Sequence, residues 1–253
     1  MRADIPTYKT RLLNLPSILI LLIFFFAAFS QSLTGFGDAL ITMALLPGLI
    51  GIQTSAPLVA IFALTIEMIV LGRYWRSLDL RAILPVIAAS VIGVPIGIWA
   101  LRNVDETLVL SALGWLIAIY AIYSLLNLKL PEMRQPAWAY LFGLFAGLLG
   151  GAYNTSGPPL VIYGNARRWP PQKFKSNLQS FFVLNSAMVF TGHLASGNVT
   201  SDVWRLYLWA IPAIVLGFLA GNKIDRYLDP DRFRKVVLWL LVFLGVRLAL
   251  MAI

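Results

Sequence analysis

Ten apolar runs, separated by short polar or basic stretches, make up most of the chain. They lie roughly at 16–34, 38–50, 56–72, 83–101, 107–126, 137–152, 155–166, 176–195, 205–222 and 233–252. A helix that spans the hydrocarbon core needs about 20 apolar residues, within a range of about 17–25. Eight runs reach or approach this length, whereas 38–50 and 155–166 do not. The pattern predicts an all-α polytopic membrane protein with about eight transmembrane helices.

Each short run follows a glycine-rich interruption and contains proline. The first interruption covers 33–37 and is followed by Pro47, and the second covers 150–154 and is followed by Pro158 and Pro159. Backbone groups that are freed inside a membrane must find partners in the protein or in a water-filled cavity. We therefore interpret both regions as broken, re-entrant or kinked segments, each followed by a half-helix.

The chain contains a weak internal repeat. A shift of 116 residues places Gly35 on Gly151 and Asp38 on Asn154, and a shift of 124 places Asp105 on Asp229. The repeat predicts two halves of equal plan, each a broken segment followed by three transmembrane helices. The expected divisions are an N-terminal tail over 1–15, a first repeat over 16–126, a linker over 127–136 and a second repeat over 137–253.

The basic residues indicate how the halves are threaded. If each broken segment returns to the side from which it starts, the stretches 73–81, 127–134, 167–175 and 223–235 share one side. That side then carries fourteen basic residues against five, with Arg247 inside a span. A single crossing of each broken segment divides the same residues nine against ten. Because cytoplasmic loops are rich in Lys and Arg, the first arrangement is favoured, and it makes the two halves inverted.

Composition removes several classes of function. Apolar residues make up 59% of the chain and charged residues 12%, far from an ordinary soluble domain. There is no cysteine and one histidine, so we expect neither a metal site nor a resident cofactor. The net charge of +9 comes without a nucleic-acid-binding signature, so we expect no nucleic-acid partner.

The two interruptions are the candidate substrate site. Half-helix N-termini offer unpaired N–H groups and partial positive charge, which suit an anion. If the interruptions meet, they form one pocket lined by hydroxyls, amides and backbone, and its glycines allow close approach of the backbone. The alternative is that the glycines serve helix packing only. The candidate substrate-binding residues are Ser32, Thr34, Gly35, Gly37, Asp38, Tyr153, Asn154, Thr155, Ser156 and Gly157.

Three further residues are candidates for coupling transport to an ion. Glu67 lies within an apolar run, where an ionisable side chain is costly and suggests function. The alternatives are a structural ion pair or a position near the cytoplasmic end of the run, five residues before Gly72. His193 lies near the end of another run, where an interfacial role is the alternative. Gln179 occupies the same run as His193 and could hydrogen-bond across helices.

Small residues at helical spacing predict close helix contacts. Pairs four residues apart allow neighbouring backbones to approach each other. We expect helix-contact faces at Gly93 and Gly97, at Gly217 and Gly221, and at Gly143, Gly147 and Gly151.

At its two interruptions the sequence resembles the TauE/SafE family of sulfite and sulfonate exporters. The resemblance rests on residues 35–38 (Gly-Phe-Gly-Asp) with Pro47, and on Gly150-Gly151 with residues 157–159 (Gly-Pro-Pro). It extends over about 18–250. Asp38 stands where many members have a third glycine. The resemblance implies a permease of the bacterial inner membrane, built from a duplicated four-span unit, that moves small anions such as sulfite or sulfoacetate.

We therefore predict a multi-pass secondary transporter that exports a small anion, such as sulfite, sulfoacetate or another organosulfonate. Its expected partners are the anion and membrane lipid, and a homo-oligomer is compatible with the sequence. An anion channel, or a transporter of another small organic acid, is the alternative. A membrane enzyme or an assembly subunit would be indicated by titratable residues clustered in the membrane or by a long soluble loop, and the sequence shows neither.

Overall fold

The computed structural model describes residues 15–74, 80–128, 130–224, 227 and 229–251. The expected N-terminal tail therefore lies, apart from residue 15, outside the described residues. All regular structure in the described part of the chain is helical. The helices are α1 (Leu15–Thr34), α2 (Asp38–Leu45), α3 (Pro47–Ile50), α4 (Ile52–Tyr74), α5 (Leu80–Asn103), α6 (Glu106–Leu126), α7 (Pro136–Tyr153), α8 (Gly157–Ala166), α9 (Pro171–Ala195), α10 (Ser201–Ile224) and α11 (Pro230–Met251).

The helices follow the apolar runs, so the predicted all-helical class is confirmed. Eight of the described helices have 18 or more residues, namely α1, α4, α5, α6, α7, α9, α10 and α11. Five of these, α1, α4, α5, α6 and α10, are long and apolar enough to cross a membrane. The run 38–50 is divided between α2 and α3, because Pro47 begins a new helical turn.

The distribution of side chains is that of a protein surrounded by lipid. Large apolar side chains cover the outside of the bundle: Trp99 is 62% exposed, Leu108 64% and Phe243 67%. Amide side chains such as Gln31 and Asn177 are fully buried. Large apolar surfaces rarely face water in a monomeric soluble protein, so the bundle's outer face is suited to hydrocarbon and its interior is polar in places.

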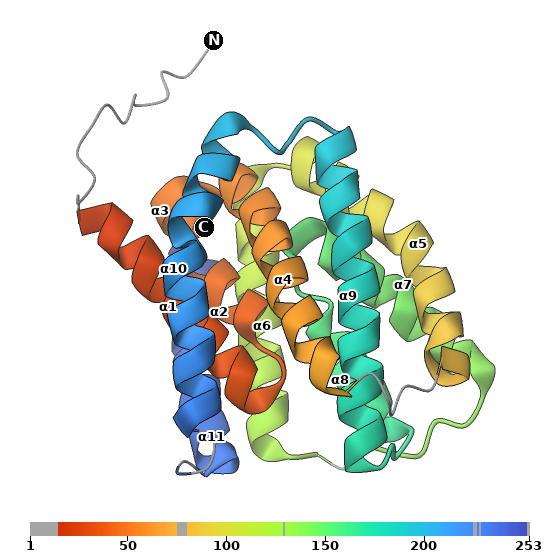
Figure 1. Cartoon of the computed structure of the whole chain (residues 1–253). Helices are drawn as coiled ribbons and strands as arrows, with labels where there is room; N and C mark the ends of the chain where they lie inside the picture. Colours follow the sequence, from red (N-terminus) through yellow and green to blue (C-terminus); the bar gives the residue numbers. More distant parts are fainter. Residues whose placement is uncertain (1–14, 75–79, 129, 225–226, 228, 252–253) are drawn as a thin grey trace.

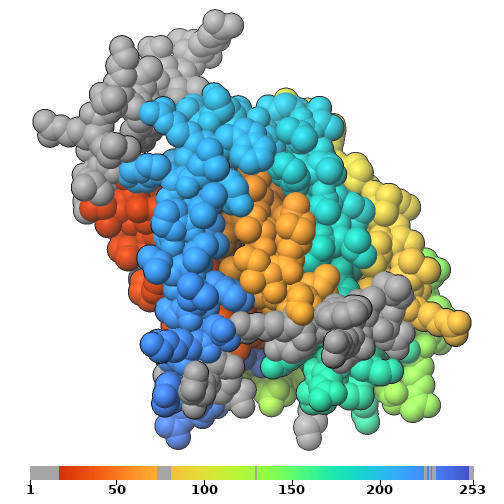
Figure 2. All heavy atoms as spheres, in the orientation of Figure 1, coloured from red at the N-terminus to blue at the C-terminus, as the bar shows by residue number. Residues whose placement is uncertain are grey.

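Helices α4 and α9 lie side by side at the centre of the bundle (Figure 1). On one side α1 packs against α10, and on the other side α5 packs against α7. Figure 2 shows α4 lying between α10 and α9 on one face of the molecule. The residues that α4 and α9 bury between these two flanking pairs are therefore available for an internal site.

The expected glycine contact faces are confirmed. A Cβ on Gly93 or Gly97 would collide with the backbone of α7, and one on Gly217 or Gly221 would collide with the backbone of α1 near Phe25 and Phe29. In both pairs the residue numbers rise together, so α5 runs parallel to α7 and α10 runs parallel to α1. Only glycine permits such close approach.

A third close contact, between α6 and α11, was not anticipated from the sequence. A Cβ on Gly114 would meet the backbone of Ala249, and one on Gly245 would meet the backbone of Ala118. Residue numbers rise on one helix as they fall on the other, so α6 and α11 are antiparallel.

The second broken segment is a hairpin. The backbone N–H of Met133 donates to the carbonyl of Ala166 (3.0 Å), and Arg167 Nη1 donates to the carbonyls of Met133 (3.1 Å) and Arg134 (3.0 Å). These bonds hold the residues just before α7 against the C-terminal end of α8, so the segment begins and ends at the same level. In Figure 1 the start of α1 and the short helix α3 likewise lie at a similar level, so the first broken segment also turns back.

Candidate functional site

The first break is a turn of two left-handed glycines between α1 and α2. Gly35 has φ 80° and Gly37 has φ 102°, values that side chains with a Cβ rarely adopt. No atom lies within 4 Å of the position that a Cβ on Gly37 would occupy. No protein atom of the described residues therefore demands a glycine here, and the requirement for glycine comes from the dihedral angle.

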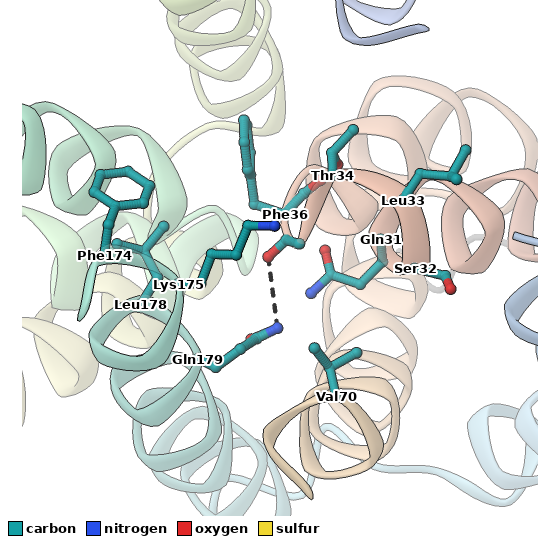
Figure 3. A pocket seen from close by; sticks show the side chains of 11 residues that line it. Gln31, Ser32, Leu33, Thr34, Phe36, Val70, Phe174, Lys175, Leu178 and Gln179 are labelled. Carbon is teal, nitrogen blue, oxygen red and sulfur yellow. Dashed lines mark hydrogen bonds between the residues drawn. The ribbon is translucent and has the colours of Figure 1, made fainter. Parts of the chain in front are cut away.

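The polar side chains before Gly35 are engaged in different ways. The Thr34 hydroxyl lies 2.9 Å from the carbonyl of Ser30 and 2.7 Å from that of Phe36, so its single proton serves the local backbone. The hydroxyl of Ser32 has no partner, and Figure 3 shows it turned away from the space between α1 and α9. Thr34 therefore shapes the break, and Ser32 contributes mainly its backbone.

The second break uses an asparagine where the first uses glycine. Asn154 has φ 56°, and the N–H groups of Asn154 and Thr155 donate to the carbonyls of Gly150 (2.7 Å) and Leu149 (3.2 Å), which ends α7. The Asn154 side chain donates through Nδ2 to the carbonyl of Ala56 on α4 (2.7 Å). This bond ties the break to the central helix.

Several polar atoms of the second break are buried without partners. Asn154 Oδ1 and Thr155 Oγ1 have none, and Tyr153, Asn154, Thr155 and Ser156 are all buried. Gly157, by contrast, has ordinary room: a Cβ there would lie 3.7 Å from Phe182 Cζ. Unsatisfied buried acceptors and hydroxyls are uncommon in folded proteins and mark this region for a role beyond packing.

The described residues do not bring the two breaks into one pocket. The first break lies beside Val70 of α4, whereas Asn154 binds the carbonyl of Ala56 on the same helix. These α4 positions are fourteen residues apart, or about 21 Å along a helix. Because α4 and α9 lie between the two broken segments (Figure 1), the expectation of a single shared pocket is not met.

A small cavity of about 30 Å³ adjoins the first break (Figure 3). It is bounded by the end of α1, the turn itself, Val70 of α4 and the first turns of α9. Gln179, expected only as a coupling candidate, donates from Nε2 to the carbonyl of Gly35 at 3.5 Å and thus joins α9 to the break. The lining residues are Gln31, Ser32, Leu33, Thr34, Gly35, Phe36, Val70, Phe174, Lys175, Leu178 and Gln179.

Two carboxylates are buried together beside the first break. Asp38 is the first residue of α2, and its carboxylate accepts a hydrogen bond from the backbone N–H of Ala39. A carboxylate at this position interacts favourably with the N-terminus of the helix. Glu67 of α4 accepts from the hydroxyl of Ser186 on α9 and interacts electrostatically with Asp38. Asp38 Oδ2 and Glu67 Oε2 have no partner, and no ion pair to either group occurs among the described residues.

This pair corrects two expectations. The structural alternative for Glu67, an ion pair, is not found in the described part of the chain. The sequence also seemed to hold no cluster of titratable residues in the membrane, yet α2 and α4 bring Asp38 and Glu67 together. Helix packing decides such contacts, and the local pattern around each residue carries no signal of them.

Buried polar groups on α9 lie between the acidic pair and the second break. Ser186 binds Glu67, and the neighbouring Asn185 lies against Gly150 of α7, with its Oδ1 unpartnered. Gln179, about two turns earlier on α9, faces the first break. The polar side chains of α9 therefore connect the surroundings of both breaks, which explains why this central helix is less apolar than the five candidate spans.

His193 lies apart from this region. It is fully buried rather than interfacial, and its Nδ1 is 2.9 Å from Asn198 Nδ2. Arg102, which donates to the carbonyl of Ser196 at 2.8 Å, is its charged neighbour. His193 is fourteen residues from Gln179 on α9, about 21 Å. The α9 residue that binds Glu67 is Ser186, seven residues or about 10 Å before His193. The polar neighbours of His193 are Asn198 and Arg102 instead.

Gln31 and Asn185 belong to this region and were not among the candidate site residues. Gln31 interrupts the apolar run of α1, and a polar side chain in such a run is itself a signal of function. Lys175 belongs to a basic cluster, so no local feature distinguished it from the other residues of that cluster.

A polytopic helical bundle with two broken segments and a polar interior is the architecture of a membrane transporter. The family model "Sulfite exporter TauE/SafE" matches residues 20–248, and the chain belongs to this family. The resemblance seen at the two glycine-rich interruptions is thereby confirmed.

Two curated proteins are similar to the chain over most of their length. The "Probable sulfite/organosulfonate exporter TauE" of Cupriavidus necator is 27% identical over 233 residues, which cover 88% of this chain and 90% of that protein. The "Probable inner membrane transporter protein TsaS" of Comamonas testosteroni is 22% identical over 179 residues, covering 70% and 75% respectively. No solved structure matches the chain.

Proposed function

We propose that the chain is a secondary transporter that exports small sulfur oxyanions, such as sulfite, sulfoacetate or another organosulfonate, across the bacterial inner membrane. The observation that carries this proposal is the buried polar region between two broken segments, inside a bundle whose outer face is apolar. Interrupted helices in a transporter typically contribute to the substrate site. Membership of the sulfite exporter family and the names of the two relatives support the substrate class.

The proposed route for the anion passes both breaks in turn. We expect residues 32–38 to contact the anion on one side of the central helices and residues 153–157 to contact it on the other. The unpartnered Thr155 hydroxyl and the backbone at Gly35 and Gly37 are its proposed contacts, together with Ser156. Neutral donors bind an oxyanion less tightly than a bidentate arginine does, which allows release.

We further propose eight transmembrane helices in two inverted halves. Under the shifts of 116 and 124 residues, α7 corresponds to α1, α10 to α5 and α11 to α6. The parallel pairs α5–α7 and α10–α1 then exchange under the repeat, which supports a two-fold relation. The equivalent helices α6 and α11 are antiparallel, as an axis in the membrane plane requires.

Cysteine labelling tests this threading without interference, because the chain has no native cysteine. Single cysteines at Gln53 and Lys173 should react from opposite sides of the membrane, with Lys173 on the cytoplasmic side. Labelling of both from one side would contradict inverted halves. Opposite labelling with Gln53 cytoplasmic would preserve the inversion and reverse the orientation.

Glu67 is the proposed carrier of a coupling proton, with Asp38 as its acidic neighbour. Two buried carboxylates without a cationic partner are costly when both are ionised, so the pair is suited to hold a proton. Two hydroxyl groups also contact polar side chains of α4. Ser186 binds Glu67, and the Tyr207 hydroxyl lies 2.7 Å from Thr65 Oγ1. We assign Gln179 to the first break, because it binds the carbonyl of Gly35. We give His193 no coupling role, because among the described residues its side chain contacts Asn198 and neither carboxylate.

Flux into proteoliposomes tests the function directly. Purified protein should move radiolabelled sulfite or sulfoacetate, and a pH gradient should change the rate. Protein-free liposomes and liposomes holding the Gly37→Val variant are the controls. Absence of flux for both anions in well-folded wild-type protein would refute the proposal.

A further inference from the structure

The cavity beside the first break contains buried polar groups that the fold leaves unpaired. Gln31 is fully buried, and neither its Oε1 nor its Nε2 has a partner. A buried amide normally forms hydrogen bonds, because leaving donor and acceptor unpaired costs free energy. Gln31 also lines the cavity, and Figure 3 shows its amide turned into that space. The side chain is therefore poised to bind something that enters there.

A second amide faces the same space from α9. Gln179 is 1% exposed; its Nε2 reaches the carbonyl of Gly35 only at 3.5 Å, and its Oε1 has no partner. In Figure 3 the amides of Gln31 and Gln179 approach the cavity from different helices. A bond of 3.5 Å is at the limit for an N–H donor, so Nε2 can turn to a better acceptor at little cost.

The charged side chain that lines the cavity is a cation, whereas the neighbouring carboxylates Asp38 and Glu67 are not among its lining residues. Lys175 lies one helical turn before Gln179 and extends its ammonium toward the break (Figure 3). A second cation, Arg234 of α11, lies 5.5 Å from the ring centroid of Phe36. None of the described residues that line the cavity is acidic. Two amide donors and nearby positive charge suit an anion.

The cavity's size restricts the anion. About 30 Å³ admits a group of a few heavy atoms, and Val70, Phe174 and Leu178 supply apolar walls. A sulfite ion, or the –SO₃⁻ end of a sulfonate, has three acceptor oxygens for the two amides and the ammonium. The carbon chain of a sulfonate would have to extend out past Lys175, which is exposed at the mouth.

We propose that this cavity is an oxyanion-binding subsite in which Gln31, Gln179 and Lys175 contact an –SO₃⁻ group. The proposal rests on the proposed transport function and names the residues that recognise the substrate. Gln31 and Gln179 come from different halves of the chain, so the subsite exists only after the halves have packed together. Because it lies at the end of α1 and near the start of α9, it is the binding site that the anion reaches first from that side.

Equilibrium binding of sulfite to the purified full-length protein tests the subsite. Lys175→Gln should weaken binding roughly ten- to hundredfold, the usual effect of losing a charged hydrogen-bond partner. Lys175→Arg should recover much of the loss. Lys173→Gln is the matched control, because it removes the same charge two residues away and does not line the cavity. Gln31→Glu, which has nearly the same shape, should abolish binding by repulsion, whereas Gln31→Met should only weaken it.

The outcomes separate this inference from the proposed function. Wild-type flux together with unchanged sulfite affinity in both Lys175→Gln and Gln31→Glu would overturn the subsite and leave transport intact. An equal loss in Lys173→Gln and Lys175→Gln would also overturn it, since general charge would then suffice. Wild-type protein that neither binds nor moves sulfite or sulfoacetate would overturn both. Thermal unfolding of each variant identifies misfolding, and Lys175, being exposed, is a site where substitution leaves the fold intact.

Discussion

The two breaks share a plan and differ in chemistry. At the first, two glycines with positive φ make the turn, the carboxylate of Asp38 begins the next helix, and a cavity adjoins it. At the second, Asn154 adopts the left-handed conformation itself, and its amide is bound to the carbonyl of Ala56 on α4. The shift of 116 residues places Asp38 on Asn154, so under the proposed repeat the first break carries an acid where the second carries its amide.

This difference indicates that the two breaks have different roles in transport. The first combines an acidic neighbour with unpaired amides and nearby cations, so it can respond to both a proton and an anion. The second is anchored to the central helix by a side chain and offers mainly hydroxyls. If the proposed repeat holds, each half keeps its backbone break and carries its own side chains there. The following variants test whether the roles differ, beginning with the largest expected effect.

Gly37→Val should abolish transport, while Gly157→Ala should leave most of it. At φ 102° a β-branched residue is strained by roughly 1–3 kcal/mol or more, whereas a Cβ at position 157 makes an ordinary contact of 3.7 Å. Proteoliposome flux and thermal unfolding measure both variants. Similar activity in the two would mean that backbone conformation does not distinguish the breaks.

Asn154→Ala should cost about 1–3 kcal/mol of stability, because the buried carbonyl of Ala56 loses its side-chain donor. Ser156→Ala, by contrast, should lower anion affinity with little change in stability, since no hydrogen bond to its side chain anchors the break. Denaturation midpoints and sulfite binding measured on the same preparations separate the two effects. If Asn154→Ala lowers affinity alone, Asn154 contacts the anion rather than the helix.

Glu67→Gln should preserve folding and flatten the pH dependence of flux, because it removes the proposed proton carrier and keeps the side chain's shape. Asp38→Asn gives the first break the amide of the second, and we expect a partial change in the same direction. Initial rates measured across pH 5 to 8, with and without a gradient, provide the comparison. Aggregation of Glu67→Gln, or a normal pH profile, would assign Glu67 to structure instead.

The smallest expected effect is on stability and concerns Asp105, which the shift of 124 residues places on Asp229. Asp105 begins α6, and hydrogen bonds from the Thr107 side chain and from the N–H groups of Thr107 and Leu108 lower its pKa below 3.8. A lowered native pKa stabilises the fold above the unfolded pKa, and this contribution is lost as the pH falls through the native value. Asp105→Ala should therefore reduce the melting temperature slightly at neutral pH and have no effect in strong acid.

Asp229, which the shift of 124 residues places on Asp105, is the comparison. Asp229 lies before α11 and accepts from the backbone N–H of Arg232 at 3.4 Å, with Arg232 Nε 3.3 Å from its Oδ2. Asp229→Ala should cause a smaller loss, because its contacts are longer than the 2.9 Å bond at Asp105 and its ion pair is exposed. A stability loss that persists in acid for Asp105→Ala would show that the carboxylate's charge is not its source.

The sequence by itself determined the helices, the breaks and several contacts between helices. Apolar runs of spanning length have few alternatives in a membrane, where backbone groups must bond within the segment. Glycines at four-residue spacing indicated where α5 meets α7 and where α10 meets α1, because small residues decide how closely helices approach. The glycine and proline strings also sufficed for the family resemblance.

The tertiary structure decided which side chains share a site. It separated the two breaks along α4, brought Asp38 to Glu67, and turned Gln31 and Gln179 toward one cavity. Periodicity predicts the buried face of a helix, but not the neighbour or depth at which each residue meets another helix. Those contacts arise between segments distant in sequence and depend on packing across both halves, so no local pattern of residues encodes them.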